Sequence, residues 1–167
     1  FCRILRAFLK CEEQTGQFKR TRYFKLVTAE EESLGTRQET AAEYAIFLKC
    51  LENQYIMEFM RIAAEITPFD TLGHVAGVHY VAMHVARQLK MLGKPVDLML
   101  MSAAAALHDI GKFGCRKEEA ARVPYLHYYY TDRYTKRFHM PVIGHIAANH
   151  STWDLELEDL SIENLIL

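Results

Sequence analysis

Two histidines and an aspartate stand where two successive helices are expected to begin and end. His74 lies near the start of a predicted helix over 71–92, and the pair His108–Asp109 closes a predicted helix over 96–109. A buried carboxylate is costly unless it is paired or binds a metal ion. Imidazole nitrogens and a carboxylate oxygen together suit zinc, iron, manganese and related divalent ions. The residue types therefore predict a divalent metal site.

The connection between these two helices is predicted to bring the three residues together. Gly93 is expected to end the first helix in a left-handed conformation, and Pro95 is expected to open the second. A short connection makes successive helices antiparallel neighbours. The start of one then meets the end of the other, which places His74 beside His108 and Asp109.

The face of the first helix that carries His74 is predicted to point inward. Its apolar stripe is formed by three valines: Val78, Val81 and Val85. His74 stands at the N-terminal end of this stripe. His79 and His84 point in other directions around the helix, because each residue advances it by about 100°. Both are expected to be surface or second-layer histidines.

The remaining elements are also predicted to be helical, so the sequence predicts an all-α fold. The expected helices cover 1–15, 37–66, 118–137 with an interruption at Pro124, Pro141 to about His150, and a last one from Ser161. The helix over 37–66 presents an apolar face of Leu48, Leu51, Tyr55, Phe59 and Ile62. That face could pack on the same domain or form a homodimer.

The composition argues against several classes of protein. Half of the residues are hydrophobic and the formal net charge is −1. No block of like charges argues for nucleic-acid binding, and no apolar run approaches the ~20 residues that span a bilayer. The four cysteines form no metal-binding or disulfide pattern. A cytoplasmic protein with reduced thiols is expected.

The spacing of the metal-site residues resembles that of a known family. The pattern His-x33-His-Asp-Ile-Gly-Lys is similar to the HD superfamily of metal-dependent phosphohydrolases, and the stretch 107–112 resembles its central HDIG-type motif. The resemblance covers residues 71–167 and implies an HD-domain helical bundle. Residues 1–70 would then be an N-terminal helical segment or linker of unknown role.

The resemblance also implies roles for single residues. His74, His108 and Asp109 would bind the metal, and Lys112 would contact phosphate or hold the Asp109 carboxylate. Asp109 could also orient the attacking water or bridge two ions. Asp109 and Lys112 are therefore the predicted catalytic residues. The cofactor would be one or two divalent ions among Fe, Mn, Mg, Zn, Co and Ni.

A second group of histidines follows in the stretch Asn149–Asp154. It looks like a degenerate form of the His-His-Glu-x-x-Asp stretch of family members that bind two metals. His150 and His145 are predicted to be ligands of a second metal or of the substrate. His127 and His139 are weaker candidates. For all four histidines the alternative is a role in helix caps and surface hydrogen bonds.

Two features depart from the family's pattern. The last aspartate ligand of the family normally lies in a hydrophobic helix, and the sequence ends at Leu167, in what reads as the start of such a helix. That ligand is therefore expected beyond Leu167. The Gly-Tyr-Pro signature of the branch that cleaves cyclic di-GMP is missing after Asp154, which argues against that substrate.

The expected activity is hydrolysis of a phosphate mono- or diester, such as a nucleotide, by a metal-activated water. Tyr130 and Arg133, in a tyrosine-rich stretch, are predicted to bind this substrate, since aromatic faces stack bases and arginine holds phosphate. Half-buried helix tyrosines are the plainer interpretation. The alternative functions are an inactive HD-type signalling or interaction domain and a purely structural helical module.

Overall fold

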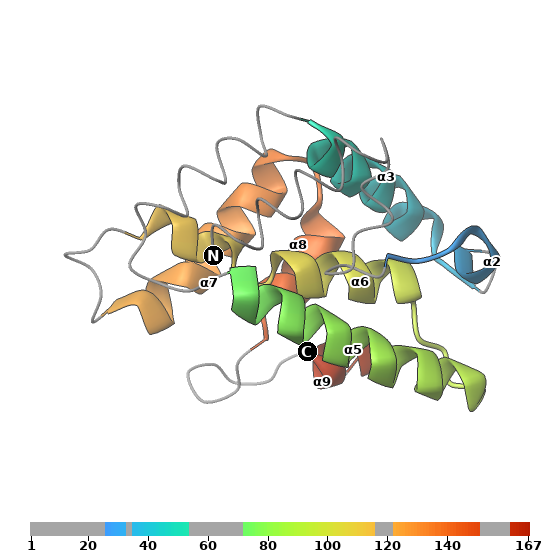
Figure 1. Ribbon diagram of the computed structural model, residues 1–167. Helices are drawn as coiled ribbons and strands as arrows, with labels where there is room; N and C mark the ends of the chain where they lie inside the picture. Colours follow the sequence, from blue (N-terminus) through green and yellow to red (C-terminus); the bar gives the residue numbers. More distant parts are fainter. Residues whose placement is uncertain (1–25, 33–34, 54–71, 116–121, 151–160) are drawn as a thin grey trace, which may run out of the picture.

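The structure, a computed structural model, describes residues 26–32, 35–53, 72–115, 122–150 and 161–167 (Figure 1). Within these ranges every regular element is helical, which confirms the predicted all-α fold. The elements in chain order are α2 (Ala29–Glu32), α3 (Gln38–Glu52), α5 (Leu72–Met91), α6 (Leu98–Leu107), the short 3₁₀ helix η2 (Ile110–Gly114), α7 (Val123–Arg137), α8 (Pro141–Ala148) and α9 (Ile162–Ile166).

Helix α6 is the centre of the bundle. Nearly all of its side chains are buried, including those of Ser102 and of the three alanines that follow it directly, Ala103, Ala104 and Ala105. A helix that is apolar all round is stable only when other elements cover every side. Helices α5, α8 and α3 provide that cover, and α5 lies alongside α6 (Figure 1). The residues that follow α6 are thereby held at a fixed place in the bundle.

The buried face of α5 is not the predicted valine stripe. Val81 and Val85 are exposed, whereas the core side of the helix is formed by Val75, His79, Ala82, Met83 and Ala86. These buried residues recur at steps of three and four, as one helical face requires. Helix α5 packs on the alanine-rich α6, and small side chains on both helices allow a close approach. The prediction of the inward-facing side was therefore wrong. The helix is rotated about its own axis, so that a different set of residues is buried.

His79 is a buried residue and not a surface one. Its side chain is 0% exposed, and its Nε2 lies 2.9 Å from Oγ of Ser102 on α6. Burial, with a smaller effect from the charge of Arg87, lowers the pKa of His79 to about 4. His79 is thus a neutral imidazole of the α5–α6 contact. His84 is exposed, as expected, and its ring contacts the amide of Gln88.

The turn between α5 and α6 follows the sequence closely. Gly93 has a φ of 76°, which confirms the predicted left-handed cap. The next helix begins at Leu98, slightly later than predicted, because the Asp97 side chain caps it by accepting a hydrogen bond from the Leu100 N–H. The backbone N–H of Asp97 donates to the buried carboxylate of Glu163, which ties α9 to this end of α6.

The N-terminal part of the described chain packs on the bundle. Tyr44 and Phe47 of α3 are buried, and Leu48 and Leu51 pack against the same core. The helix was predicted to continue to residue 66, but it ends at Glu52 with an extended residue after it. Tyr55, Phe59 and Ile62 of the predicted apolar face lie outside the described residues. The homodimer through this face stays a prediction.

Helices α7 and α8 carry further residues that the sequence offered for the metal site, among them His127 and His145. Helix α7 begins at Val123 with Pro124 in its first turn, so the proline starts the helix and does not interrupt it. Helix α8 begins at Pro141, as predicted, and its first N–H groups at Val142 and Ile143 donate to the buried carboxylate of Glu43 on α3. Among the helices of the described ranges, none is long and apolar enough to cross a bilayer.

Candidate metal centre

The His-Asp pair lies in a tight turn between α6 and η2. His108 directly follows the last residue of α6, and Asp109 precedes the first residue of η2. Both are almost fully buried, with exposures of 2% and 1%. The turn is pressed against α7, since a methyl group added at Gly111 would overlap the carbonyl oxygen of His127. This position therefore requires a glycine.

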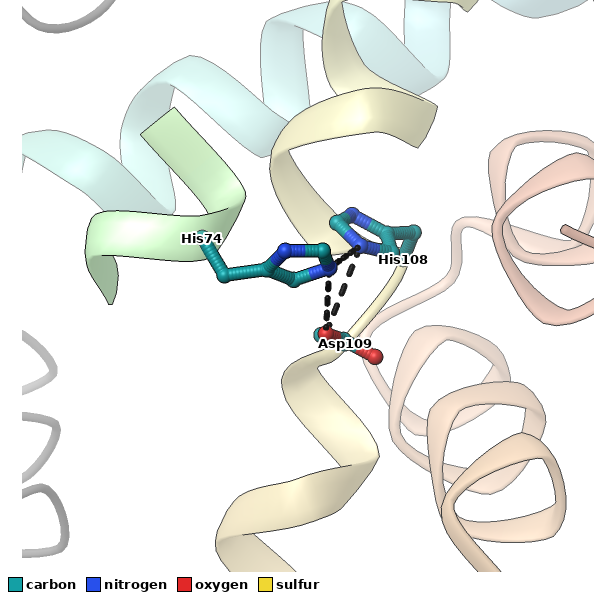
Figure 2. A group of neighbouring side chains, drawn as sticks. All are labelled: His74, His108 and Asp109. Carbon is teal, nitrogen blue, oxygen red and sulfur yellow. Dashed lines mark hydrogen bonds and ion pairs between the residues drawn. The ribbon is translucent and has the colours of Figure 1, made fainter. Parts of the chain in front are cut away.

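The first group of possible ligands joins this turn to the start of α5. The Nε2 atoms of His74 and His108 lie 3.3 Å and 3.4 Å from Oδ2 of Asp109. The same two nitrogens lie 3.3 Å from each other (Figure 2). The predicted meeting of the two helix ends is thus present. Figure 2 shows the three side chains converging from α5 and from the end of α6.

His108 is oriented by its own helix. Its Nδ1 lies 2.8 Å from the carbonyl oxygen of Ala105, and a carbonyl can only accept a hydrogen bond, so Nδ1 carries the hydrogen. In the neutral ring, Nε2 then presents its lone pair toward Asp109 and His74. A backbone carbonyl on the far nitrogen is the usual way in which a metal-binding histidine is held in one tautomer.

A second group lies on the other oxygen of the same carboxylate. The Nε2 atoms of His127 and His150 lie 3.6 Å and 3.7 Å from Oδ1 of Asp109, and 3.2 Å from each other. His127 comes from α7, and His150 follows the end of α8. The Nδ1–H of His150 donates to the carbonyl of Ala147 at 2.7 Å, which leaves Nε2 directed at the carboxylate.

The ionisation of these groups favours a cation between them. Burial, helped by the charge of nearby His108, lowers the pKa of His150 to about 4. Burial alone would raise the pKa of Asp109, but the hydrogen bonds and charges that a protonated His108 and Lys112 supply outweigh it, so this pKa lies well below its ordinary value. The neutral Nε2 of His150 therefore faces the ionised Oδ1 of Asp109, an arrangement that a cation between the two atoms would stabilise.

Among the described residues, only one of the two Asp109 side-chain oxygens has a hydrogen-bond partner. Oδ2 accepts a hydrogen bond from Nζ of Lys112 at 2.6 Å. Oδ1 is buried and has no hydrogen-bond partner within the described part of the chain. Such an atom is expensive unless something else compensates it. In both groups the ligand atoms lie within 4.8 Å of one another, and nitrogen and oxygen are suitable donors for divalent transition metals. The residues present therefore fit a metal ion.

The other residues predicted to be in the site are not in these groups. His145 is exposed on α8, where its Nδ1 lies 3.3 Å from the side-chain nitrogen of Asn149. The buried face of α8 carries Ile143 and Ile146 instead, so His145 points elsewhere. The structure thus does not bring His145 to Asp109. His139 is exposed after the end of α7, with a φ of 61° typical of a helix cap.

Of the three residues predicted to bind the substrate, Lys112 contacts Asp109, whereas Tyr130 and Arg133 do not belong to the two histidine groups. Tyr130 packs beside Gly114 of η2 and stacks on Tyr134. Arg133 is exposed, and its guanidinium donates to the hydroxyl of Tyr129. These positions agree with the alternative interpretation, in which the tyrosines are half-buried residues of a helix and only their hydroxyl groups are polar.

His127, predicted as a weaker candidate, lies in the second group, and Tyr128, which was not predicted to be in the site, packs beside it. Tyr128 is 7% exposed, and its ring centroid lies 3.9 Å from that of His127 and 5.1 Å from that of His150. A helix that begins at Val123, with Pro124 in its first turn, places His127, Thr131 and Thr135 on one face, four residues apart. That spacing of small polar side chains was the available signal.

Comparison with known proteins agrees with the geometry. Residues 71–167 match the family model described as HD domain, which is more than half of the chain. No curated protein and no solved structure matches the chain at a significant level. HD domains bind divalent metal ions and are generally metal-dependent phosphohydrolases. The matched region contains both groups of possible metal ligands, and the chain belongs to the HD domain family.

Proposed function

We propose that this domain hydrolyses a phosphate mono- or diester with divalent metal ions held on both sides of Asp109. The observation that carries the proposal is the division of this carboxylate between two histidine pairs. Oδ2 faces His74 and His108, and Oδ1 faces His127 and His150. A carboxylate in this position can be shared by two ions, one in each group.

The proposed ligands follow from these contacts. His74, His108 and Asp109 would hold one ion, and Asp109, His127 and His150 would hold the other. His127 takes the place that the sequence suggested for His145. When bound, such ions polarise a phosphate ester and supply a hydroxide at neutral pH. A nucleotide or a related small phosphate ester remains the proposed substrate class.

Asp109 would act as a ligand and not as a proton donor. Its pKa lies well below the ordinary value, so the carboxylate is ionised at neutral pH. Lys112 holds the Oδ2 oxygen at 2.6 Å and restricts the carboxylate to one orientation. An oriented carboxylate oxygen next to the reacting phosphate can also accept a hydrogen bond from the attacking water.

Exposure indicates the side from which a phosphate would approach. The side chain of His74 is 50% exposed and that of Lys112 is 23% exposed. Asp109 and His127 are buried, with 1% and 6% exposed. A substrate would therefore reach the centre over His74 and Lys112. The Lys112 ammonium can then stabilise phosphate charge as well as the aspartate.

The test compares metal content and activity in the same preparations. The chain is freed of metal with a chelator, reloaded with Mn²⁺, Fe²⁺, Co²⁺ or Ni²⁺, and assayed on aryl phosphate mono- and diesters and on nucleotides. We expect bound metal and hydrolysis in the wild type, and loss of both in His108→Ala. His84→Ala, which changes an exposed histidine of α5, should keep both.

Two results would contradict the proposal in different ways. Absence of bound metal after reloading would remove the basis for the chemistry. Stoichiometric metal without hydrolysis of any ester in the panel would favour the alternative, a non-catalytic HD-type signalling or interaction domain.

A further inference from the structure

One face of α7 carries buried polar side chains at intervals of four residues. His127, Thr131 and Thr135 are 5%, 0% and 2% exposed. Residues four apart lie above one another on the same side of a helix. His127 belongs to the second ligand group, so the two threonines lie on the face of α7 that turns toward the candidate centre. Buried hydroxyls need hydrogen-bond partners, and the partners of these two differ.

The hydroxyl of Thr131 bonds to the backbone on both sides of Asp109. Its Oγ1 donates to the carbonyl oxygen of His108 at 3.1 Å and accepts from the N–H of Gly111 at 3.0 Å. His108 precedes the aspartate and Gly111 follows it by two residues. One side chain of α7 therefore fixes both ends of the turn that carries Asp109.

Two close approaches support this arrangement. A Cβ at Gly111 would lie 2.6 Å from the Thr131 nitrogen and 2.7 Å from its Oγ1, so the turn has no space to move toward α7. One helical turn further, Gly144 of α8 is in similar contact with the Thr135 side chain. Helix α7 is thus packed at short distance against both elements that flank His127, the Asp109 turn and α8.

We infer that Thr131 is a positioning residue, whose hydroxyl holds the Asp109 turn against α7 so that Oδ1 faces His127. This inference rests on the proposed function for its consequence, which is the second metal site. His74, His108 and Asp109 lie on α5 and on the turn itself. Asp109 and His127, by contrast, lie on different elements, and the contact between the turn and α7 brings them together. Loss of the hydroxyl should therefore weaken the second group more than the first.

The first test measures the affinity for metal. Mn²⁺ is titrated into the metal-free chain, and its binding is measured by calorimetry. In Thr131→Val, a substitution of nearly equal volume, the affinity of the Mn²⁺ step that His127→Ala abolishes should fall about tenfold or more, as for other residues that orient ligands. Thr131→Ser keeps the hydroxyl and should restore it. Thr135→Val is the matched control, because the bonds of that hydroxyl to described residues go to carbonyls of its own helix, at Thr131 and Asp132.

A second measurement needs no metal. Amide hydrogen exchange at Gly111 reports the bond from its N–H to Thr131. This exchange should be about tenfold faster or more in Thr131→Val than in the wild type and Thr135→Val, which corresponds to the loss of one buried hydrogen bond. Should Thr131→Val fail to fold, Thr131→Ala removes the same hydroxyl without adding volume and serves in its place.

The outcomes separate this inference from the proposed function. Unchanged exchange at Gly111, or an equal change in Thr135→Val, overturns the role of Thr131. So does an equal loss of both Mn²⁺ steps in Thr131→Val. A wild type that takes up no Mn²⁺ while the exchange result holds would refute the proposed metal chemistry and leave Thr131 as the residue that fixes the turn.

Discussion

Nε2 of His127 lies 3.6 Å from Oδ1 of Asp109, whereas His74 lies 3.3 Å from the other oxygen, Oδ2. The aspartate therefore belongs to two groups of possible ligands at once, and its neighbours in each group come from different helices. Any change that removes the carboxylate should affect both groups, and any change on α7 should affect one. This division makes the candidate centre open to test by single substitutions.

The first prediction separates the two groups by metal content. Asp109→Asn should lose all tightly bound metal, because a neutral amide cannot serve two cations and the histidines alone give too few ligands. His127→Ala should lose only the ion of its own group and keep the other. Elemental analysis after dialysis against a metal-free buffer measures both. His139→Ala, at an exposed cap, is the control and should match the wild type.

Equal metal content in His127→Ala and the wild type would exclude His127 as a ligand. The opposite failure, complete loss in His127→Ala, would mean that the two groups do not bind independently.

The second prediction concerns the lysine that holds the carboxylate. Lys112→Met keeps the length and apolar character of the side chain but removes the ammonium 2.6 Å from Oδ2. Asp109 then loses a charge-assisted hydrogen bond in a buried place, and the phosphate loses a positive neighbour. We expect kcat to fall about 100-fold or more with metal content retained at saturating Mn²⁺. Steady-state kinetics on an aryl phosphate would measure it.

Lys136→Met is the matched control for this prediction. Lys136 pairs with Asp132 at 2.8 Å, but the lysine side chain is 61% exposed and the pair lies within one helix. Exposed pairs of this kind contribute little. A comparable loss of kcat in both variants would show that Lys112 has no special role in the reaction.

The sequence predicted the parts of the site that short-range rules determine. The helix pair joined by Gly93 has to be antiparallel because its connection is short, and this brings His74 to His108. The side of α5 that faces inward could not be predicted in the same way. This helix has both a valine stripe and an alanine-rich stripe, and only the small side chains of α6 decide which one is buried.

The contact of His127 with Asp109 could not be predicted from the sequence either. No local pattern relates His127 to Asp109, because their contact depends on how closely α7 approaches the turn at Gly111. Pro124 was predicted to interrupt the helix, but it lies in the first turn of α7. The prediction therefore did not place His127 and Thr131 on one face of a continuous helix. His145 was favoured for its place near His150 in the sequence, but the helical rotation of α8 directs it to the surface.

The third prediction is a pH dependence of stability that arises from His79. Its pKa is about 4 in the folded chain, below the ordinary 6.5. The unfolded chain therefore binds this proton more readily, so the contribution of His79 is complete above about pH 6.5 and is lost as the pH falls toward 4. The loss amounts to as much as about 3 kcal/mol. Urea unfolding at several pH values would measure the free energy of unfolding.

The comparison that isolates this effect uses His79→Gln, which cannot titrate but can still bond to Ser102. Its free energy of unfolding should fall less steeply between about pH 6.5 and 4 than that of the wild type. His84→Gln, at an exposed position of the same helix, should keep the wild-type slope. Equal slopes in all three proteins would show that folding does not lower the pKa of His79.

The fourth prediction compares two glycines with opposite surroundings. At Gly77, inside α5, an added Cβ meets nothing within 4 Å, and alanine is the better helix former. Gly77→Ala should therefore raise the free energy of unfolding by about 0.5 to 1 kcal/mol. At Gly111 the same Cβ would overlap the backbone of α7, which cannot yield as the tip of a flexible side chain can. Gly111→Ala should destabilise the fold by about 3 kcal/mol or more. Chemical unfolding measures both, and a neutral Gly111→Ala would mean that the turn and α7 are not in tight contact.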